Sequence, residues 1–298
     1  MVGTPPPRDL HGETMKKTAL ALTMSLTLGV SASAQADPCP DTLRFADTGI
    51  EGMEEMVRTF GPFGEALGDA VGSRIEFFPV SDRTAAVNAL QFDQVDIILA
   101  GPSEYAVMRS RQDVQLMVGL ERAEYGTAFV VHADSDIHSL EDLRGKDIAL
   151  KDAGSTTGHI VPSWMLVNAG LDLDRDVNTH LLDGARFEAL INRDVDAMGS
   201  GVRDVARLKE RDPNGDYRVI AESDTMPRDA FVARGGLDQA CVAHVNEQIM
   251  ADAENLMEAI LGPGRRDKYT NARFVNDLTE EEFDLITEAY DLVGIRLN

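Results

Sequence analysis

Strand-like and helix-like segments alternate along the chain from about residue 42. The short apolar stretches TLRFADT (42–48), RIEFFPV (74–80) and VDIILAG (95–101) read as strands. The segments between them, MEEMVRTFGPFGEALGDAV (53–71) and TAAVNALQF (84–92), read as helices, the first with apolar residues at mixed i+3/i+4 spacing. This β-α-β-α-β order predicts parallel strands with helices on both faces of a sheet.

A second unit of the same kind follows, and the chain then returns to strand and helix. Strands are expected at 114–120, 125–134, 147–152, 179–184, 195–201, 217–223 and 230–236, with a short helix at 139–145 and a mostly helical tail from about 238. The pattern predicts an α/β fold with two lobes, 37–130 plus 228–298 and 131–227. Ligand would bind in a cleft between them, at the carboxyl ends of strands. A single large α/β enzyme domain is the structural alternative.

Residues 1–36 are predicted to be removed from the mature chain. Met15 opens MKKTALALTMSLTLGVSASAQA, in which two lysines precede an apolar stretch that ends in Ala34-Gln35-Ala36. This is the pattern of a secretory signal with its cleavage site. The apolar part is too short and too rich in Thr and Ser for a good spanning helix. Residues 1–14 read as an upstream extension, and the exported chain is expected to begin near Asp37 in the periplasm.

The charge balance excludes some partners. The 298 residues contain 51 Asp and Glu against 28 Lys and Arg, a formal net charge of −23. Such a surface disfavours non-specific binding to nucleic acid and to anionic membranes. We therefore expect no nucleic-acid partner.

Two cysteines, Cys39 and Cys241, lie in the exported part of the chain. Export allows a disulfide between them, which would close a loop of about 200 residues. The alternative is two free, buried thiols, and we favour the disulfide. The sequence has no CxxC or Cys/His cluster of the zinc-binding type. We expect no metal site and no cofactor.

The stretch DAGSTTGHIVPSWML (152–166) carries the clearest chemistry. A strand ends, Gly154 and Gly158 let the backbone approach a ligand closely, and the hydroxyl residues Ser155, Thr156 and Thr157 precede a helix. Free N–H groups at a helix start favour anions, so this stretch predicts an oxyanion cradle without a cationic side chain. The alternative is an elaborate helix cap. Pro162 implies that regular helix begins near Gly158 or His159, or begins at Thr156 and is kinked.

Other predicted ligand contacts follow other strands. Thr48 lies in DTGIEG (47–52), Ser103 and Tyr105 lie in AGPSEY (100–105), and Asp183 lies in LDGAR (182–186). Tyr125 precedes a crossing strand, where a ring could close over a ligand. Considered alone, each of these residues would be interpreted as a helix cap or a packed core residue. Because all of them lie next to strand ends, together they predict one ligand site.

Catalytic motifs are weak. The sequence lacks GxSxG and HExxH. His159 could pair with Ser155 in a periplasmic hydrolase, but one histidine beside a hydroxyl-rich turn is usually a polar helix residue. Such an enzyme would need an activating base within hydrogen-bond reach of the serine.

Two stretches resemble the periplasmic substrate-binding proteins of ABC importers for phosphonate, phosphite and related anions. They are RTAAVNALQFDQVDIILAGPSEYAVM (83–108) and HSLEDLRGKDIALKDAGSTTGHIVPSWML (138–166). The resemblance runs over about 42–235. It implies a two-lobed type II periplasmic-binding-protein fold, no enzymatic activity, a small anionic ligand, an inner-membrane permease as partner and a monomer. It also implies that Ser155, Thr156 and Thr157 contact the ligand's oxygens. The same architecture serves proteins that hand ligand to a sensor kinase.

This sequence departs from the family pattern at two positions. Asp183 stands where anion-binding members usually carry His, and Gly201 stands where they often carry Asp. A carboxylate would repel a dianion unless it were protonated or paired, for example with Arg186. Other ligands therefore stay open. They are a monoanion, a zwitterion, a neutral oxyacid such as arsenite, and ferric iron held by Tyr105, Tyr125 and Asp183. The full predicted ligand set is Thr48, Ser103, Tyr105, Tyr125, Ser155, Thr156, Thr157, Gly158, His159 and Asp183.

Overall fold

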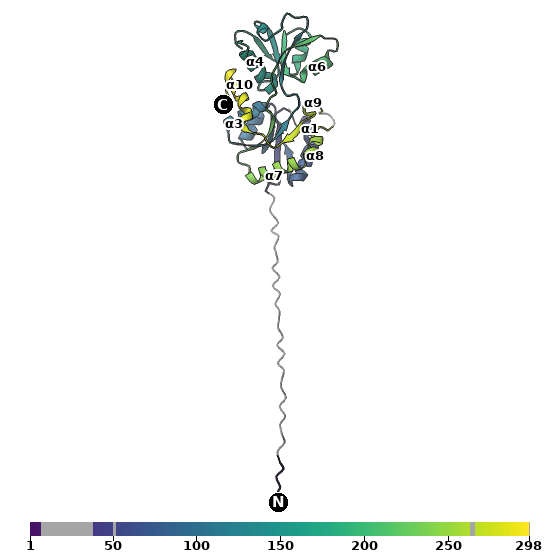
Figure 1. Cartoon of the computed structure of the whole chain (residues 1–298), viewed down its shortest axis with the longest axis vertical. Helices are drawn as coiled ribbons and strands as arrows, with labels where there is room; N and C mark the ends of the chain where they lie inside the picture. The colour runs from purple at the N-terminus through teal and green to yellow at the C-terminus, as the bar shows by residue number, and fades with distance from the viewer. Residues whose placement is uncertain (7–37, 50–51, 263–265, 298) are drawn as a thin grey trace. The chain divides into compact units, whose positions relative to one another are not determined.

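The structure is a computed structural model that describes residues 1–6, 38–49, 52–262 and 266–297 (Figure 1). The predicted signal segment and its cleavage site lie outside these residues. The described residues from Pro38 onward belong to one compact unit. Within the described ranges, no helix combines the length and the apolar character needed to cross a bilayer.

The first sheet is mixed and has the order β11-β4-β10-β3-β1-β2. Its strands are β1 (Thr42–Asp47), β2 (Arg74–Phe77), β3 (Ile97–Ala100), β4 (Val114–Glu121), β10 (Asp229–Arg234) and β11 (Arg273–Val275). β1 pairs in parallel with β2 and β3, and β10 runs antiparallel between β3 and β4. The sheet and its helices are called the first lobe below.

Helices cover both faces of this sheet. They are α1 (Met53–Val71), α2 (Arg83–Gln91), α3 (Pro102–Arg111), α7 (Gln239–Ala251), α8 (Ala253–Ile260) and α9 (Arg266–Tyr269). Successive strand residues point to opposite faces, so Phe45 packs against α1, α7 and α8 while Ala46 packs with α2 and α3. Both faces are therefore apolar, which explains why the strands read as continuous apolar runs.

The second sheet has the order β7-β6-β8-β5-β9 and forms the second lobe. Its strands are β5 (Thr127–His132), β6 (Asp147–Leu150), β7 (Asn178–Leu181), β8 (Ala197–Gly201) and β9 (Tyr217–Glu222), and its helices are α4 (Val161–Asn168), α5 (Arg186–Ile191) and α6 (Asp204–Arg211). β6 is parallel to β7 and β8. The predicted α/β class with parallel β-α-β-α-β units is confirmed. The helix expected at 139–145 is a single 3₁₀ turn, Glu141–Leu143.

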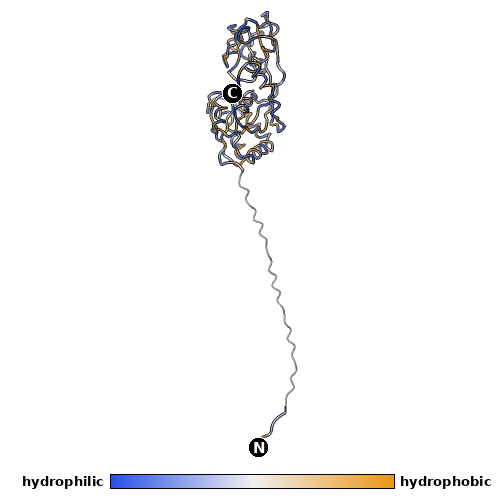
Figure 2. The backbone as a smooth tube through the Cα atoms, turned by 90° about the vertical axis from the view of Figure 1, so that its left-hand side faces the viewer, coloured by the Kyte–Doolittle hydropathy of each residue, from blue (hydrophilic) through white to orange (hydrophobic). Residues whose placement is uncertain are grey.

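Two crossing segments, 122–126 and 223–228, connect the sheets. A C-terminal helix, α10 (Asp284–Leu292), lies against α3 of the first lobe and α4 of the second (Figure 1). Its buried residues Ile286, Ala289 and Tyr290 join the second lobe's apolar cluster. Hydrophobic and hydrophilic segments alternate through both lobes (Figure 2).

The predicted disulfide between Cys39 and Cys241 is confirmed. It ties the segment before β1 to the first turn of α7, across a sequence separation of 202 residues. In the chain-entropy view, a loop of this length removes substantial freedom from the unfolded chain.

Candidate functional site

A cavity of about 590 Å³ lies between the two lobes. Its walls come from the segments that follow β1, β3, β4, β6 and β8. Strand carboxyl ends are where α/β proteins commonly bind ligands. Six residues of the predicted ligand set line it: Thr48, Tyr125, Ser155, Thr156, Thr157 and Asp183.

The hydroxyl turn, Ser155–Thr157, enters a π-helical turn at Thr156–Ile160, and α4 begins at Val161. Pro162 explains this start. It has no N–H, so the carbonyls of Thr157 and Gly158 need other donors. The Thr127 hydroxyl donates to the Thr157 carbonyl (3.0 Å) and the Lys151 N–H donates to the Gly158 carbonyl (2.8 Å). The proline therefore lies at the start of the α-helix, and the preceding turn is free to form part of the cavity wall.

Two glycines shape this turn. Gly154 has φ 82°, in the left-handed region that glycine adopts without strain. Gly158 packs on Lys151, where an added Cβ would come within 2.4 Å of the Lys151 Cβ. Both glycines therefore serve the close approach of the turn to the end of β6.

The three hydroxyls of the turn have different roles. Thr156 Oγ1 accepts a hydrogen bond from the Ser103 N–H at the start of α3, at 3.1 Å, so it joins the two lobes. The Ser155 and Thr157 hydroxyls have no hydrogen-bond partner among the residues that the structure describes. Both residues line the cavity. These two hydroxyls are therefore available to a ligand.

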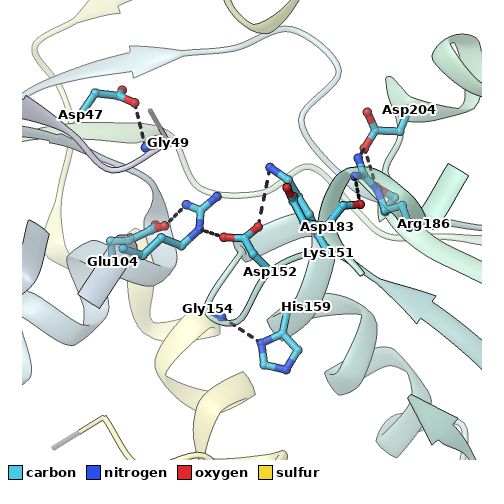
Figure 3. Close-up of polar contacts among 12 residues, drawn as sticks. Asp47, Gly49, Glu104, Lys151, Asp152, Gly154, His159, Asp183, Arg186 and Asp204 are labelled. Atoms are coloured by element: carbon cyan, nitrogen blue, oxygen red, sulfur yellow. Dashed lines mark hydrogen bonds and ion pairs between the residues drawn. The ribbon is translucent and has the colours of Figure 1, made fainter. Parts of the chain in front are cut away.

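Four predicted ligand residues do not line this cavity. Tyr105 is fully buried in the first lobe, with its ring centroid 4.3 Å from that of Phe283. Ser103 is also fully buried and reaches the site through its backbone N–H. Gly158 contributes its carbonyl to the backbone of Lys151, and His159 points to Gly154 (Figure 3).

His159 holds the glycine turn in place. Its Nδ1 accepts a hydrogen bond from the Gly154 N–H at 3.0 Å, which requires an unprotonated Nδ1 (Figure 3). No hydrogen bond joins its ring to the Ser155 hydroxyl among the described residues. Burial lowers the pKa of His159, and the charge of Asp152 only partly opposes this.

This histidine predicts a pH dependence. Because its pKa in the fold lies below the ordinary value of 6.5, the unfolded chain binds the proton more readily as the pH falls through 6.5. Its contribution to stability is therefore complete above that pH and lost below it. We expect His159→Asn, whose Oδ1 can accept the same bond without titrating, to flatten the fall in melting temperature between neutral pH and mild acid. Exposed His138→Asn is the control; equal slopes for all three proteins would contradict this role.

Cationic side chains line the cavity, and of these the sequence analysis named only Arg186, as a possible partner of Asp183. Among the residues that the structure describes there are nine, Arg58, Arg83, Arg122, Lys151, Arg186, Arg203, Arg207, Arg211 and Lys268. The six carboxylates in the same lining are Glu55, Glu104, Glu124, Asp183, Asp204 and Asp229. The lining thus has an excess of three positive charges within a chain of net charge −23. The local field favours anions despite the acidic surface, whose distant charges are screened by salt.

An ion-pair chain joins the two lobes beside the cavity (Figure 3). Arg83, the first residue of α2, donates from Nε to Asp152 of the second lobe at 2.6 Å and also pairs with Glu104 of α3. Burial alone would lower the pKa of Arg83, but Glu104 and Asp152 raise it above its usual value. The guanidinium therefore stays charged and couples the lobes.

Asp183 and Arg186 do not form the ion pair considered from the sequence. Arg186 pairs with Asp204 at 2.7 Å, and its second terminal nitrogen donates to the main-chain carbonyl of Asp183 (Figure 3). The Asp183 side chain is exposed at the cavity. In the described residues, no group of three or more His, Cys, Asp or Glu side chains is placed to hold a metal ion.

Comparisons with known proteins agree with this architecture. Residues 49–274 match the family described as "ABC transporter, phosphonate, periplasmic substrate-binding protein". The phosphate-import protein PhnD of Mycolicibacterium smegmatis is 24% identical over 289 residues, and the match covers 88% of this chain and 89% of that protein.

Two solved structures share the fold. XAC2383 from Xanthomonas citri, bound to ATP, has a TM-score of 0.69 at 20% identity and covers 86% of this chain and 98% of its own. PhnD1 from Prochlorococcus marinus (MIT 9301), in complex with methylphosphonate, has a TM-score of 0.67 at 15% identity. The match covers 86% of this chain and 99% of that chain. The two-sheet α/β fold is that of periplasmic binding proteins, and the match over most of the chain assigns the family. This chain belongs to the periplasmic substrate-binding proteins of phosphonate-type ABC transporters, a transport family and not an enzyme family.

Proposed function

We propose that the cavity binds a small phosphorus oxyanion, of the phosphonate, phosphite or phosphate class, for import. The observation that carries the proposal is the pair of unpartnered hydroxyls, Ser155 and Thr157, in a cavity with excess positive charge. Hydrogen bonds from such donors to charged oxygens are stronger than those to neutral acceptors. The named relatives, a phosphate-import protein and a methylphosphonate complex, support the same class.

The two lobes would close around the ligand. We propose the division into lobes expected from the sequence, 37–130 with 228–298 and 131–227, with its first boundary moved to the crossing segment 122–126. The boundary moves because all of β5 pairs within the second sheet. A closed form would use hydrogen bonds between the lobes. Two such bonds are present, from Arg83 to Asp152 and from the Ser103 N–H to Thr156. Ligand shifts the population toward the form that binds it better, and that form would dock on the permease. We propose a monomer; delivery to a sensor kinase is the alternative to transport.

The export signal is also part of the proposal. Members of the family act in the periplasm, and residues 15–36 would direct export there, with cleavage after Ala36. N-terminal sequencing of the exported protein tests this site. A chain that kept Met1 or Met15 would contradict it.

The other ligand classes have less support. Ferric iron would need hard ligands, but Tyr105 is fully buried against Phe283. Hydrolysis by Ser155 and His159 would need a base for the serine, and His159 Nδ1 already accepts from Gly154. A neutral oxyacid would gain little from the charged lining.

A thermal-shift panel tests the ligand class. Phosphite, methylphosphonate, phosphate, arsenite, sulfate and ferric iron are compared on the dialysed protein. A ligand that binds only the folded state raises stability by about 2.7 kcal/mol at 100 times its Kd. We expect a phosphorus oxyanion to give the largest shift. The proposal would be contradicted if only arsenite or ferric iron raised the melting temperature, or if none of the compounds did.

A further inference from the structure

Arg122 lies on the first-lobe side of the cavity, directly after β4. Its Nη2 donates to Asp229 at 2.8 Å, and its guanidinium lies over the Tyr125 ring, 3.4 Å from the centroid. The side chain is 13% exposed, and its buried Nε has no hydrogen-bond partner in the described part of the chain. Burial alone would lower the pKa of Arg122, but Asp229 and Tyr125 raise it, so the guanidinium stays charged. The structure thus holds a fixed cation with unused donor capacity.

Lys268, from α9, lies on the same side of the cavity. Its Nζ is 3.7 Å from Asp47 Oδ2, and within the described ranges it has no acceptor at hydrogen-bond distance. The ammonium lies against Gly49, where an added Cβ would come within 2.7 Å of Nζ. Asp47 is itself held by the Tyr269 hydroxyl and the Gly49 N–H. Gly49 and Asp47 therefore position the ammonium without using its donors.

The two cations form one charged patch. Burial raises the pKa of Asp229, and the positive charges of Arg122 and Lys268 both oppose this rise. Asp47 and Asp229 in turn oppose the lowering of the Lys268 pKa by burial. The hydroxyl turn, Ser155–Thr157, lines the same cavity from the second lobe. A ligand between the lobes would thus meet cations on one wall and neutral donors on the other.

On the basis of the proposed function, we propose that Arg122 and Lys268 are the cationic contacts of the ligand. They select a doubly ionised phosphonate or phosphate group over a singly charged sulfonate of the same shape. A second negative charge on the ligand adds little to the binding free energy from neutral hydroxyl donors. It adds much more to the attraction of two partly buried cations. Asp229 and Asp47 act as positioning residues. This patch supplies the positive charge that the hydroxyl turn lacks.

Isothermal titration at mildly alkaline pH compares methylphosphonate with methanesulfonate, which is isosteric but carries one charge. The unmodified protein should prefer methylphosphonate by about 100-fold. Lys268→Met should weaken methylphosphonate binding by about 10- to 100-fold and methanesulfonate binding much less, so the preference narrows. Arg122→Lys keeps the positive charge but loses the planar donor set, so it should weaken the binding of both ligands and leave the preference largely unchanged. Lys209→Met, outside the cavity, is the matched control and should bind as the unmodified protein does.

The outcomes separate this inference from the proposed function. Binding of methylphosphonate with no preference over methanesulfonate, or with no loss in Lys268→Met and Arg122→Lys, would overturn the inference and leave the function standing. No binding of any phosphorus oxyanion by the unmodified protein would overturn both. If Arg122→Lys failed to fold, the double variant Arg122→Gln/Asp229→Asn, which removes both charges of the pair, would replace it, with at least the same expected loss of methylphosphonate affinity.

Discussion

A protein carrying Ser155→Ala together with Thr157→Val is expected to lose methylphosphonate affinity by about 10²- to 10⁴-fold. Each substitution removes one hydroxyl donor that would bond to a charged oxygen, and such bonds contribute about 1.5–3 kcal/mol each. The two hydroxyls have no partner among the described residues, so their loss should leave the unfolding free energy of the unliganded protein nearly unchanged. Isothermal titration and thermal melting measure the two effects.

Two comparisons sharpen this prediction. Thr156→Val removes the acceptor of the Ser103 N–H and should therefore cost about 1–3 kcal/mol of stability, unlike the double variant. The pair Ser110→Ala with Thr179→Val removes the same groups at exposed positions and should bind normally. If the Ser155/Thr157 variant kept its affinity, the hydroxyl turn would be a helix cap and not a ligand contact.

Asp204→Ala is expected to destabilise the second lobe by about 3–5 kcal/mol, the largest loss of stability that we predict. Asp204 pairs with Arg186 at 2.7 Å, and the two side chains are only 9% and 4% exposed. Burial alone would raise the pKa of Asp204, but Arg186 and Ser200 hold it below its usual value. Removing the carboxylate would leave the Arg186 guanidinium buried without its anion.

Chemical denaturation of the variant and a control measures this effect. Asp134→Ala breaks an ion pair with Arg193 in which both side chains are more than half exposed, and it should cost about 0–1 kcal/mol. A loss for Asp204→Ala no larger than that of the control would show that water or a neighbouring group replaces the carboxylate.

The fold could be predicted because its information is local. Apolar runs of four to eight residues separated by amphipathic helices determine the alternation of strand and helix, and short connections then allow few topologies. Pro162 illustrates the limit. The sequence left two helix starts open, and the structure has neither, because a π-helical turn occupies Thr156–Ile160 and α4 begins at Val161. The Thr157 carbonyl accepts a hydrogen bond from the hydroxyl of Thr127, a residue distant in the sequence.

The candidate site was only partly predictable for the same reason. The hydroxyl turn is contiguous in sequence, so its chemistry can be read directly. The cations come from five or more separate segments, and Arg122 and Lys268 carry no motif of their own. Tyr105 lies only two residues after Ser103, but the helical turn of α3 directs its ring into the core beside Phe283. Lys151 directly precedes the stretch 152–166 that the sequence analysis assigned to the site, and this position was the one available signal.

A crystal structure of the protein with methylphosphonate tests the central claim most directly. We predict a phosphonate group between the lobes, with its oxygens accepting hydrogen bonds from Ser155 and Thr157 on one side and from Arg122 and Lys268 on the other. A phosphonate bound elsewhere on the chain, or one in this cavity without contact to the hydroxyl turn, would contradict the account.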